Sequence, residues 1–152
     1  ERMRQNVQRL DARNVTLVAT DARETALSAV DAVLVDAPCT GTGTFRRHPD
    51  ARWRLRISDL AVSGAAQRAI LRAAAALVRA GGLLIYSTCS LEPEENDAQV
   101  TQFLAEHPDF QLEPPPAGTV PESTIDAGML RVIPQRHGAD GAFAARLRRS
   151  AG

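Results

Sequence analysis

Two cysteines occupy corresponding positions, each just after an apolar run that reads as a strand. Cys39 lies in the segment Asp36–Gly43 (DAPCTGTG), and Cys89 lies in the segment Ser87–Asn96 (STCSLEPEEN). A thiol at a strand-to-helix junction can be activated as a nucleophile by helix amides and a nearby acid–base partner. A lone cysteine is more often a small buried hydrophobe. Two at matching strand ends, each in a turn rich in Pro, Gly and Thr, favour a catalytic pair.

The spacing of the cysteines argues against a metal site. The interval from Cys39 to Cys89 is 50 residues (89 − 39), too long for a zinc knuckle, and four-ligand zinc spacing is absent. Two cysteines are also too few for a disulfide framework. A two-cysteine redox protein is an alternative, although it would more often carry a Cys-x-x-Cys motif. A Cys39–Cys89 bridge found by mass spectrometry after diamide treatment would favour it.

The only basic cluster that includes an aromatic residue lies between the two cysteine motifs. It comprises Arg46, Arg47, His48, Arg52, Arg54 and Arg56, with Trp53 among them. Arginines for phosphate and an aromatic ring for stacking suit RNA. The alternative is a solvated charged turn, and for Trp53 itself we favour burial as a packing anchor. The chain as a whole has 18 basic and 18 acidic residues, so its mean charge does not indicate a nucleic-acid binder.

Strands and helices alternate in the elements that must position these residues. We expect helices over Glu1–Leu10, Ile57–Ala80 and Glu94–His107, a loop over Leu112–Asp126, and strands over Val15–Thr20, Ala32–Val35, Leu83–Ser87, Met129–Ile133 and Ala142–Leu147. The last two strands read as a closing hairpin. The alternation predicts an α/β doubly wound sheet, whose ligands bind outside the carboxyl ends of the strands. Asp21, Asp36, Cys39 and Cys89 all follow such ends.

Composition excludes several other classes. The chain has 152 residues, enough for one domain with a real core, and its 24% charged and 44% hydrophobic residues are typical of globular proteins. The longest apolar stretch, Ala73–Val78, is too short to span a bilayer. The first residues are not followed by an apolar core, so we expect no signal peptide. We therefore predict a cytoplasmic location and no membrane partner.

Taken together, the two cysteine motifs resemble the Sun/Fmu family of RNA cytosine-5 methyltransferases. Within it, the resemblance is strongest to the branch of the bacterial small-subunit ribosomal RNA methyltransferase B, and it runs over essentially the whole chain. Ala142 departs from the family pattern, because a second aromatic residue is usual there. Further positions that match are Arg46, Arg47, His48, Pro49, Asp50, Trp53, Gln67, His137, Asp140, Gly141 and Phe143.

The resemblance implies a Rossmann-like class I methyltransferase sheet with a C-terminal antiparallel hairpin, S-adenosylmethionine as cofactor, and RNA, in particular 16S ribosomal RNA, as substrate. It makes Cys89 the nucleophile that adds to C6 of cytosine, so that C5 becomes enamine-like and can accept the methyl group. It makes Cys39 the residue that assists removal of the C5 proton and release of the product. Addition followed by elimination is ordinary covalent catalysis.

The resemblance also assigns cofactor and substrate contacts. Asp36 matches an acid beside the methionine part of the cofactor and the target base, where a carboxylate can accept hydrogen bonds from an ammonium or amine. Pro38 would stiffen that turn. Asp21 matches an acid that contacts the adenine amino group, although a helix N-cap is its alternative role. The implied RNA-binding residues are Arg46, Arg47 and His48.

Two features of the family's cofactor site are not found in this sequence: the glycine-rich loop after the first strand and the acid that ends the second. We therefore expect residues 1–152 to form a partial methyltransferase domain, its C-terminal part, without the first two strands. An exposed sheet edge would then favour self-association or a partner fragment. The alternative is a catalytically silent RNA-binding or assembly module that keeps part of the fold.

Overall fold

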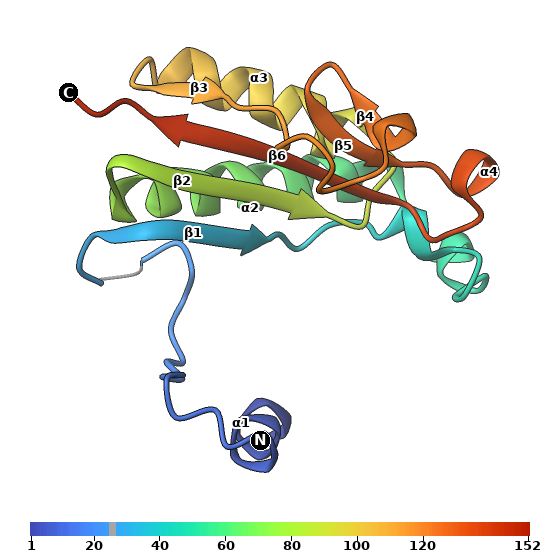
Figure 1. Cartoon of the computed structure of the whole chain (residues 1–152). Helices are drawn as coiled ribbons and strands as arrows, with labels where there is room; N and C mark the ends of the chain where they lie inside the picture. Colours follow the sequence, from blue (N-terminus) through green and yellow to red (C-terminus); the bar gives the residue numbers. More distant parts are fainter. Residues whose placement is uncertain (25–26) are drawn as a thin grey trace.

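The computed structural model describes residues 1–24 and 27–152. Its centre is a six-stranded mixed sheet in the order β1-β2-β6-β5-β4, with β3 paired to β6 (Figure 1). Strands β1 and β2 are parallel, and the remaining pairs are antiparallel. The strand bounds are β1 Val30–Asp36, β2 Val78–Thr88, β3 Phe110–Leu112, β4 Ile125–Asp126, β5 Met129–Val132 and β6 Ala142–Arg149.

Two long helices, α2 and α3, lie on the same face of the sheet (Figure 1). The helical segments are α1 Arg2–Arg9, η1 Thr42–Thr44, η2 Ala51–Trp53, α2 Ile57–Leu77, η3 Pro93–Glu95, α3 Asp97–Glu106, η4 Glu122–Thr124 and α4 Pro134–His137. Asp59, in the first turn of α2, accepts a hydrogen bond from the Arg56 N–H, which satisfies one of the free donors at the helix start.

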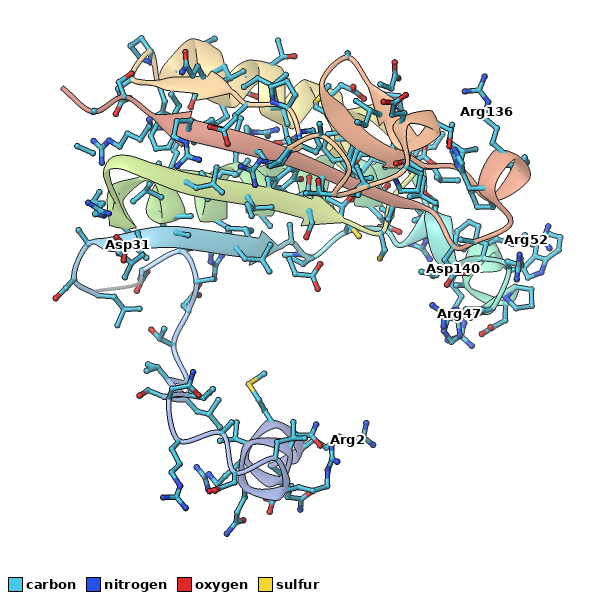
Figure 2. All side chains as sticks on the ribbon, in the orientation of Figure 1. Arg2, Asp31, Arg47, Arg52, Arg136 and Asp140 are labelled. Atoms are coloured by element: carbon cyan, nitrogen blue, oxygen red, sulfur yellow. The ribbon has the colours of Figure 1, made fainter. Side chains whose placement is uncertain are left out.

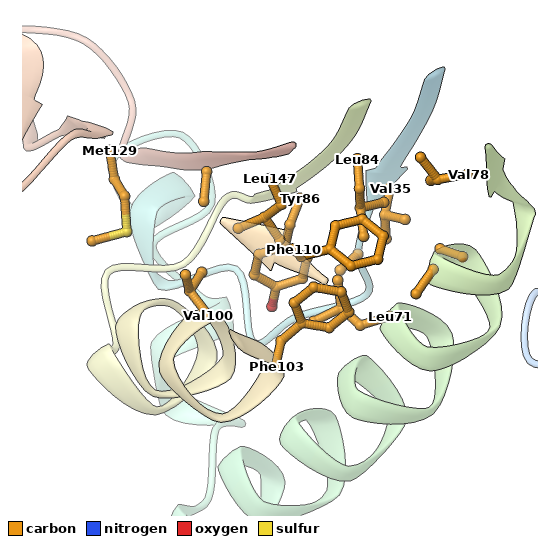
Figure 3. Packing of buried hydrophobic residues seen from close by; sticks show 14 of the residues in the cluster. Val35, Leu71, Val78, Leu84, Tyr86, Val100, Phe103, Phe110, Met129 and Leu147 are labelled. Atoms are coloured by element: carbon orange, nitrogen blue, oxygen red, sulfur yellow. The ribbon is translucent and has the colours of Figure 1, made fainter. Parts of the chain in front are cut away.

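The hydrophobic core lies between the sheet and these two helices (Figure 3). From Gly82 onward strand β2 alternates: Leu84 and Tyr86 are fully buried beneath the helices, whereas Leu83 and Ile85 on the opposite face are only half-buried. Leu71 of α2 and Phe103 of α3 close the core from the other side. Period-2 burial of this kind is typical of a sheet with one covered face. The expectation of helices on both faces is therefore not met within the described residues.

Most of the expected elements are present. The α/β class, the first helix, the strands around Ala32–Val35 and Leu83–Ser87, and the closing hairpin are all confirmed. The long helix ends at Leu77 rather than Ala80, because Val78 takes an extended conformation and pairs with Val30 at the start of β2. The loop after α3 holds β3 at its beginning, since Phe110 pairs with Arg149 of β6.

The strand expected at Val15–Thr20 is wrong. Among the described residues this segment has no ladder partner, and its Val15, Leu17 and Val18 side chains are exposed. The natural place for it would be the open edge of β1. Only the nine residues 21–29 separate the two segments, fewer than the dozen or more that a parallel crossover needs. A run of β-branched residues without a partner strand therefore stays extended.

Candidate active site

The parallel pairing of β1 with β2 brings the two cysteines together. Asp36 pairs with Ser87 at the carboxyl ends of the two strands, and each cysteine follows two or three residues later. The Cys39 Sγ and Cys89 Sγ atoms are 3.4 Å apart, and both thiols are free and half-buried. The structure therefore brings the two cysteines together, and their catalytic roles stay a prediction.

A buried carboxylate and a buried amide together fix the backbone on both sides of Cys39. Glu95, fully buried in η3, accepts hydrogen bonds from the Thr40 N–H at 2.9 Å and the Thr40 hydroxyl at 2.5 Å. The side-chain amide of Gln67, from α2, donates to Glu95 at 3.2 Å and to the Pro38 carbonyl at 2.9 Å. The residues before and after Cys39 are thus held by the same two buried side chains.

A second set of polar contacts holds the Cys89 segment. The Thr88 hydroxyl donates to Asn96 at 2.6 Å, and the Asn96 amide donates to the Ser90 carbonyl at 3.0 Å. The Tyr86 hydroxyl donates to the Glu95 carbonyl at 2.6 Å. Buried polar groups that satisfy one another in this way favour a single backbone arrangement. The same short segment, η3 and Asn96, therefore braces both cysteines.

A glycine lets the third segment of the site approach. The Gly43 N–H donates to the Cys89 carbonyl at 2.9 Å, and the Gly141 N–H donates to the Gly43 carbonyl at 2.8 Å. A Cβ at Gly43 would lie 2.7 Å from both the Cys89 and the Gly141 carbonyl oxygens. No larger residue fits without a backbone shift. The first cysteine motif, the second, and the turn before β6 therefore meet at this point.

The environments of the two thiols are not equivalent. Burial, with an added contribution from the contact with Cys89, raises the pKa of the Cys39 thiol to about 12. At neutral pH Cys39 therefore holds its proton. The S–H of Cys39 can donate to Cys89 Sγ, because the two atoms are within hydrogen-bond range for sulfur. The site can thus keep a protonated thiol beside a second sulfur that is available for attack.

Asp36 and Pro38 line an open pocket of about 250 Å³ beside the free edge of β1. Val33, Leu34 and Ile70 supply apolar walls, and Asp36 is exposed, with a 3.4 Å contact from the Ser87 hydroxyl. An acid at the end of an apolar pocket fits the ammonium end of an amphipathic ligand. The volume is below the 300–1,000 Å³ or so of most complete ligand sites.

Asp21 does not line this pocket, although its neighbour Ala22 does. Asp21 pairs with Arg23, whose side-chain hydrogen bond lowers the pKa of the Asp21 carboxyl to about 2. It also accepts a hydrogen bond from the Arg23 N–H at 2.9 Å, as a capping residue would. Residues 22–24 form a turn rather than a helix, so this contact closes a local turn.

The predicted RNA-binding residues Arg46, Arg47 and His48 are exposed near the carboxyl ends of β1 and β2. Arg46 donates to the Gly138 carbonyl at 2.8 Å, and Arg47 pairs with Asp140. Figure 2 shows Arg47, Arg52 and Asp140 together at this end of the molecule. Two of the three side chains thus tie the loop to the turn before β6 while remaining on the surface.

Trp53 contradicts the expectation that it is a packing anchor. It is 83% exposed at the end of the turn η2. The flanking residues Arg52 and Arg54 are charged and exposed, so the loop offers the indole little apolar surface to pack against. Its recorded ring contact is with the Arg52 guanidinium, 5.7 Å from the ring centre.

Sequence reasoning missed the role of Glu95. In the sequence, Glu94, Glu95 and Asn96 read as the acidic first turn of a helix. In the structure Glu94 is exposed, whereas Glu95 is fully buried. The sequence places Gln67 both on the long helix and among the positions that match the family. A detectable signal is a Gln at a core position of the long helix, because a buried amide requires polar partners.

Comparison with known proteins places the chain among ribosomal RNA methyltransferases. A model of the family described as 16S rRNA methyltransferase RsmB/F matches residues 1–148. A probable ribosomal RNA small subunit methyltransferase B from Synechocystis is 43% identical over 125 residues, which is 80% of this chain and 28% of that protein. These matches cover both cysteine motifs and the helix between them.

Two solved structures share the fold. One, described as PH0851, aligns with a TM-score of 0.89 and 38% identity over 97% of this chain and 34% of its own. NSun6 from Pyrococcus horikoshii, solved with SFG, aligns with a TM-score of 0.81 and 33% identity over 97% of this chain and 38% of its own. The chain thus spans about a third of the length of each relative. The Rossmann-like methyltransferase sheet with its closing hairpin is confirmed.

The described residues contain neither a helix that could cross a membrane nor a cluster of side chains placed to hold a metal ion. No described helix is both long enough and apolar enough to cross a membrane. Among residues 1–24 and 27–152, no group of three or more His, Cys, Asp or Glu side chains is placed to hold a metal ion.

Proposed function

Because the chain belongs to the 16S rRNA methyltransferase RsmB/F family, we propose that it takes part in methyl transfer from S-adenosylmethionine to C5 of cytosine in 16S ribosomal RNA. The observation that carries this proposal is the 3.4 Å contact between Cys39 Sγ and Cys89 Sγ at the carboxyl ends of two parallel strands. A ribosomal RNA substrate would also make a cytoplasmic location natural.

Cytosine C5 is a poor nucleophile until C6 is attacked. In the proposed reaction the Cys89 thiolate forms a bond to C6, and the ring electrons shift so that C5 can bond to a methyl carbon. S-adenosylmethionine supplies that methyl group as a sulfonium. Loss of the C5 proton and breakage of the C6–S bond then release 5-methylcytosine and free Cys89.

Cys39 is suited to assist the second half of this reaction. Because its pKa is raised, Cys39 holds its proton in the resting site. Its Sγ lies beside Cys89, so it is close to the carbon that Cys89 attacks and to the neighbouring C5 proton. To act as the base, Cys39 must first give its own proton to solvent. The thiolate so formed would be a strong base, because its pKa is raised, and would take the C5 proton.

Asp36 and Pro38 are the proposed contacts for the amino acid end of the cofactor, with the apolar pocket walls beside it. The relative NSun6 was solved with SFG, an analogue of S-adenosylmethionine, which supports use of this cofactor. We propose that Asp21, next to Ala22 in the pocket wall, contacts the adenine amino group. Calorimetric titration with S-adenosylhomocysteine tests this half of the proposal, and saturable one-to-one binding is expected.

Transfer of tritiated methyl groups to a 16S ribosomal RNA transcript tests the activity. We expect mass spectrometry of the digested RNA to show 5-methylcytidine with the full chain and none with Cys89→Ala. A methyl group on any other atom would contradict the proposal. RNA binding without methyl transfer would favour the alternative, a catalytically silent RNA-binding or assembly module.

A further inference from the structure

We propose that the turn η2 is a stacking platform for a base of single-stranded RNA, with the Trp53 indole against the base and the Arg54 guanidinium on the adjacent phosphate. The proposal rests on the proposed function, because it takes the strand to be the one whose cytosine reaches the cysteines. It adds a contact that the roles given to Arg46, Arg47 and His48 do not include.

The first support is the exposure of the ring. Tryptophan is highly buried on average in folded proteins, yet Trp53 is 83% exposed on a short turn. The Arg52 guanidinium lies over one part of the ring system at 5.7 Å, while its Nε donates to the Pro49 carbonyl. A flat indole beside a flat guanidinium is the kind of surface on which nucleobases stack.

The second support is the local charge. The chain has no net charge, but the segment 46–56 contains five arginines, Arg46, Arg47, Arg52, Arg54 and Arg56, against the single acid Asp50. Arg54 pairs with Asp50 across exposed side chains. Such a pair contributes little and exchanges readily for a phosphate. The cationic side of a neutral molecule is thus concentrated around the exposed ring.

The third support is a groove that connects the turn to the cysteines. An open groove of about 290 Å³ has Cys39 and Thr40 in its lining together with Ala51 and Arg54, which flank Trp53 in sequence. The rest of its lining is Leu55, Asp59 and Ser63. A nucleotide held at the turn would therefore place its neighbour along the wall that leads to Cys39. The groove therefore favours a nucleic-acid strand over a polypeptide as the partner of the turn, because only the strand has a base to deliver to Cys39.

Trp53 is the only tryptophan in the chain, so it reports on its own contact. In titrations excited at 295 nm, we expect a short cytidine-containing single-stranded RNA to quench the emission with saturation. A charge-only polyanion such as heparin should bind without comparable quenching. Stacking requires a base face, whereas electrostatic contact does not.

Separate variants test the stacking contact of Trp53 and the phosphate contact of Arg54. With fluorescently labelled RNA and anisotropy as readout, Trp53→Ala should weaken binding about tenfold and Trp53→Phe much less, because phenylalanine keeps a stacking ring. Arg54→Ala should lower the slope of log affinity against log salt by about 0.7, as expected for one phosphate contact on a single strand. Arg2→Ala is the matched charge control, since Arg2 lies on α1, well away from the loop (Figure 2). Circular dichroism confirms that each variant is folded.

Absence of quenching by RNA, or equal affinity of wild type and Trp53→Ala, would overturn the platform. Emission changes that depend on protein concentration without RNA would assign the ring to contact with a second copy instead, and would also overturn it. The proposed function is tested apart from this. If methyl transfer is unchanged in Trp53→Ala, the stacking proposal is wrong and the proposed activity stands. If RNA quenches Trp53 emission but no methyl group is transferred, the proposed activity is wrong and the stacking proposal stands.

Discussion

The chemistry of this site depends on two identical side chains that are made unequal by their surroundings. Cys39 and Cys89 are 3.4 Å apart, yet burial gives Cys39 a pKa of about 12. A thiol that keeps its proton cannot attack C6 but can later manage the proton on C5. The assignment of attack to Cys89 and of release to Cys39 rests on the resemblance, and the raised pKa of Cys39 is compatible with it.

Substitution of each cysteine should have a different consequence. Cys89→Ala should lower methyl transfer by more than about a thousandfold, because it removes the thiol that forms the bond to C6 in the proposed reaction. Cys39→Ala should permit attack but slow release, so a covalent protein–RNA adduct should accumulate. Denaturing gels of end-labelled RNA measure the adduct. If both variants merely slow turnover to the same extent, the division of roles is wrong.

The raised pKa of Cys39 also predicts a pH dependence of stability. The unfolded chain loses this proton near pH 9, the model value, and the folded chain only near pH 12. The contribution of the protonated Cys39 thiol to the free energy of unfolding is therefore fully present below about pH 9, and it is lost as the pH rises from 9 toward 12. Urea unfolding at pH 8 and pH 10.5 should show a larger loss for wild type than for Cys39→Ala.

Tyr86 requires a control in that experiment. Burial, followed by the nearby Glu95 charge, raises the pKa of the Tyr86 hydroxyl, so this residue contributes a loss in the same direction. The comparison is therefore repeated in a Tyr86→Phe background, where the difference made by Cys39 should persist. Identical pH dependence with and without Cys39 would contradict the prediction.

At the scale of elements, the short segment η3 and Asn96 connects what the sequence shows as separate motifs. Glu95 binds Thr40 and Gln67, and Asn96 binds Thr88 and Ser90. Four residues, from α2, from the end of β2 and from the loops after β1 and β2, thus converge on two adjacent buried side chains. A disturbance there should alter the alignment of both cysteines without touching either of them.

Glu95→Ala tests this positioning role. The change leaves the Thr40 N–H and the Gln67 amide without their buried acceptor, so the free energy of unfolding should fall by about 1–3 kcal/mol. Where the variant is still folded, kcat should fall while KM for RNA stays close to wild type, and Glu95→Gln should recover part of kcat. Glu94→Ala is the matched control, because Glu94 is the exposed neighbour. Loss of stability with unchanged kcat would make Glu95 purely structural.

The sequence predicted elements where local pattern decides and failed where distant residues decide. Helix α2 and strand β2 follow from periodicity and from apolar runs, and the cysteine pair follows from matching strand ends. The pattern of Val15–Thr20 is equally strand-like, but a strand also needs a partner, which local pattern does not supply. Likewise Glu95 and Glu94 are alike in sequence, and only the convergence of α2, β1 and β2 buries one of them. The prediction that Trp53 is a buried anchor also fails, because its flanking residues Arg52 and Arg54 are charged and exposed and offer the ring little apolar surface.

At the scale of the whole molecule, the sheet is asymmetric at its edges. Strand β1 pairs only with β2 among the described residues, so its other edge leaves backbone groups unpaired. Leu34 on β1 is 68% exposed, and Val15, Leu17 and Val18 of the unpaired segment are exposed as well. Unpaired edges with apolar side chains are templates for association between chains. The chain also spans only about a third of the length of its relatives.

We therefore expect self-association through the β1 edge. Sedimentation velocity over a concentration series should show a dimer or larger species that grows with concentration. Leu34→Lys should shift the equilibrium toward monomer, because a charge on an edge strand opposes pairing. Val62→Lys is the control, since Val62 is similarly exposed, at 70%, but lies on α2. Because Leu34 also lines the pocket beside Asp36, saturating S-adenosylhomocysteine should lower association too. A clean monomer at every concentration would show that the β1 edge does not pair.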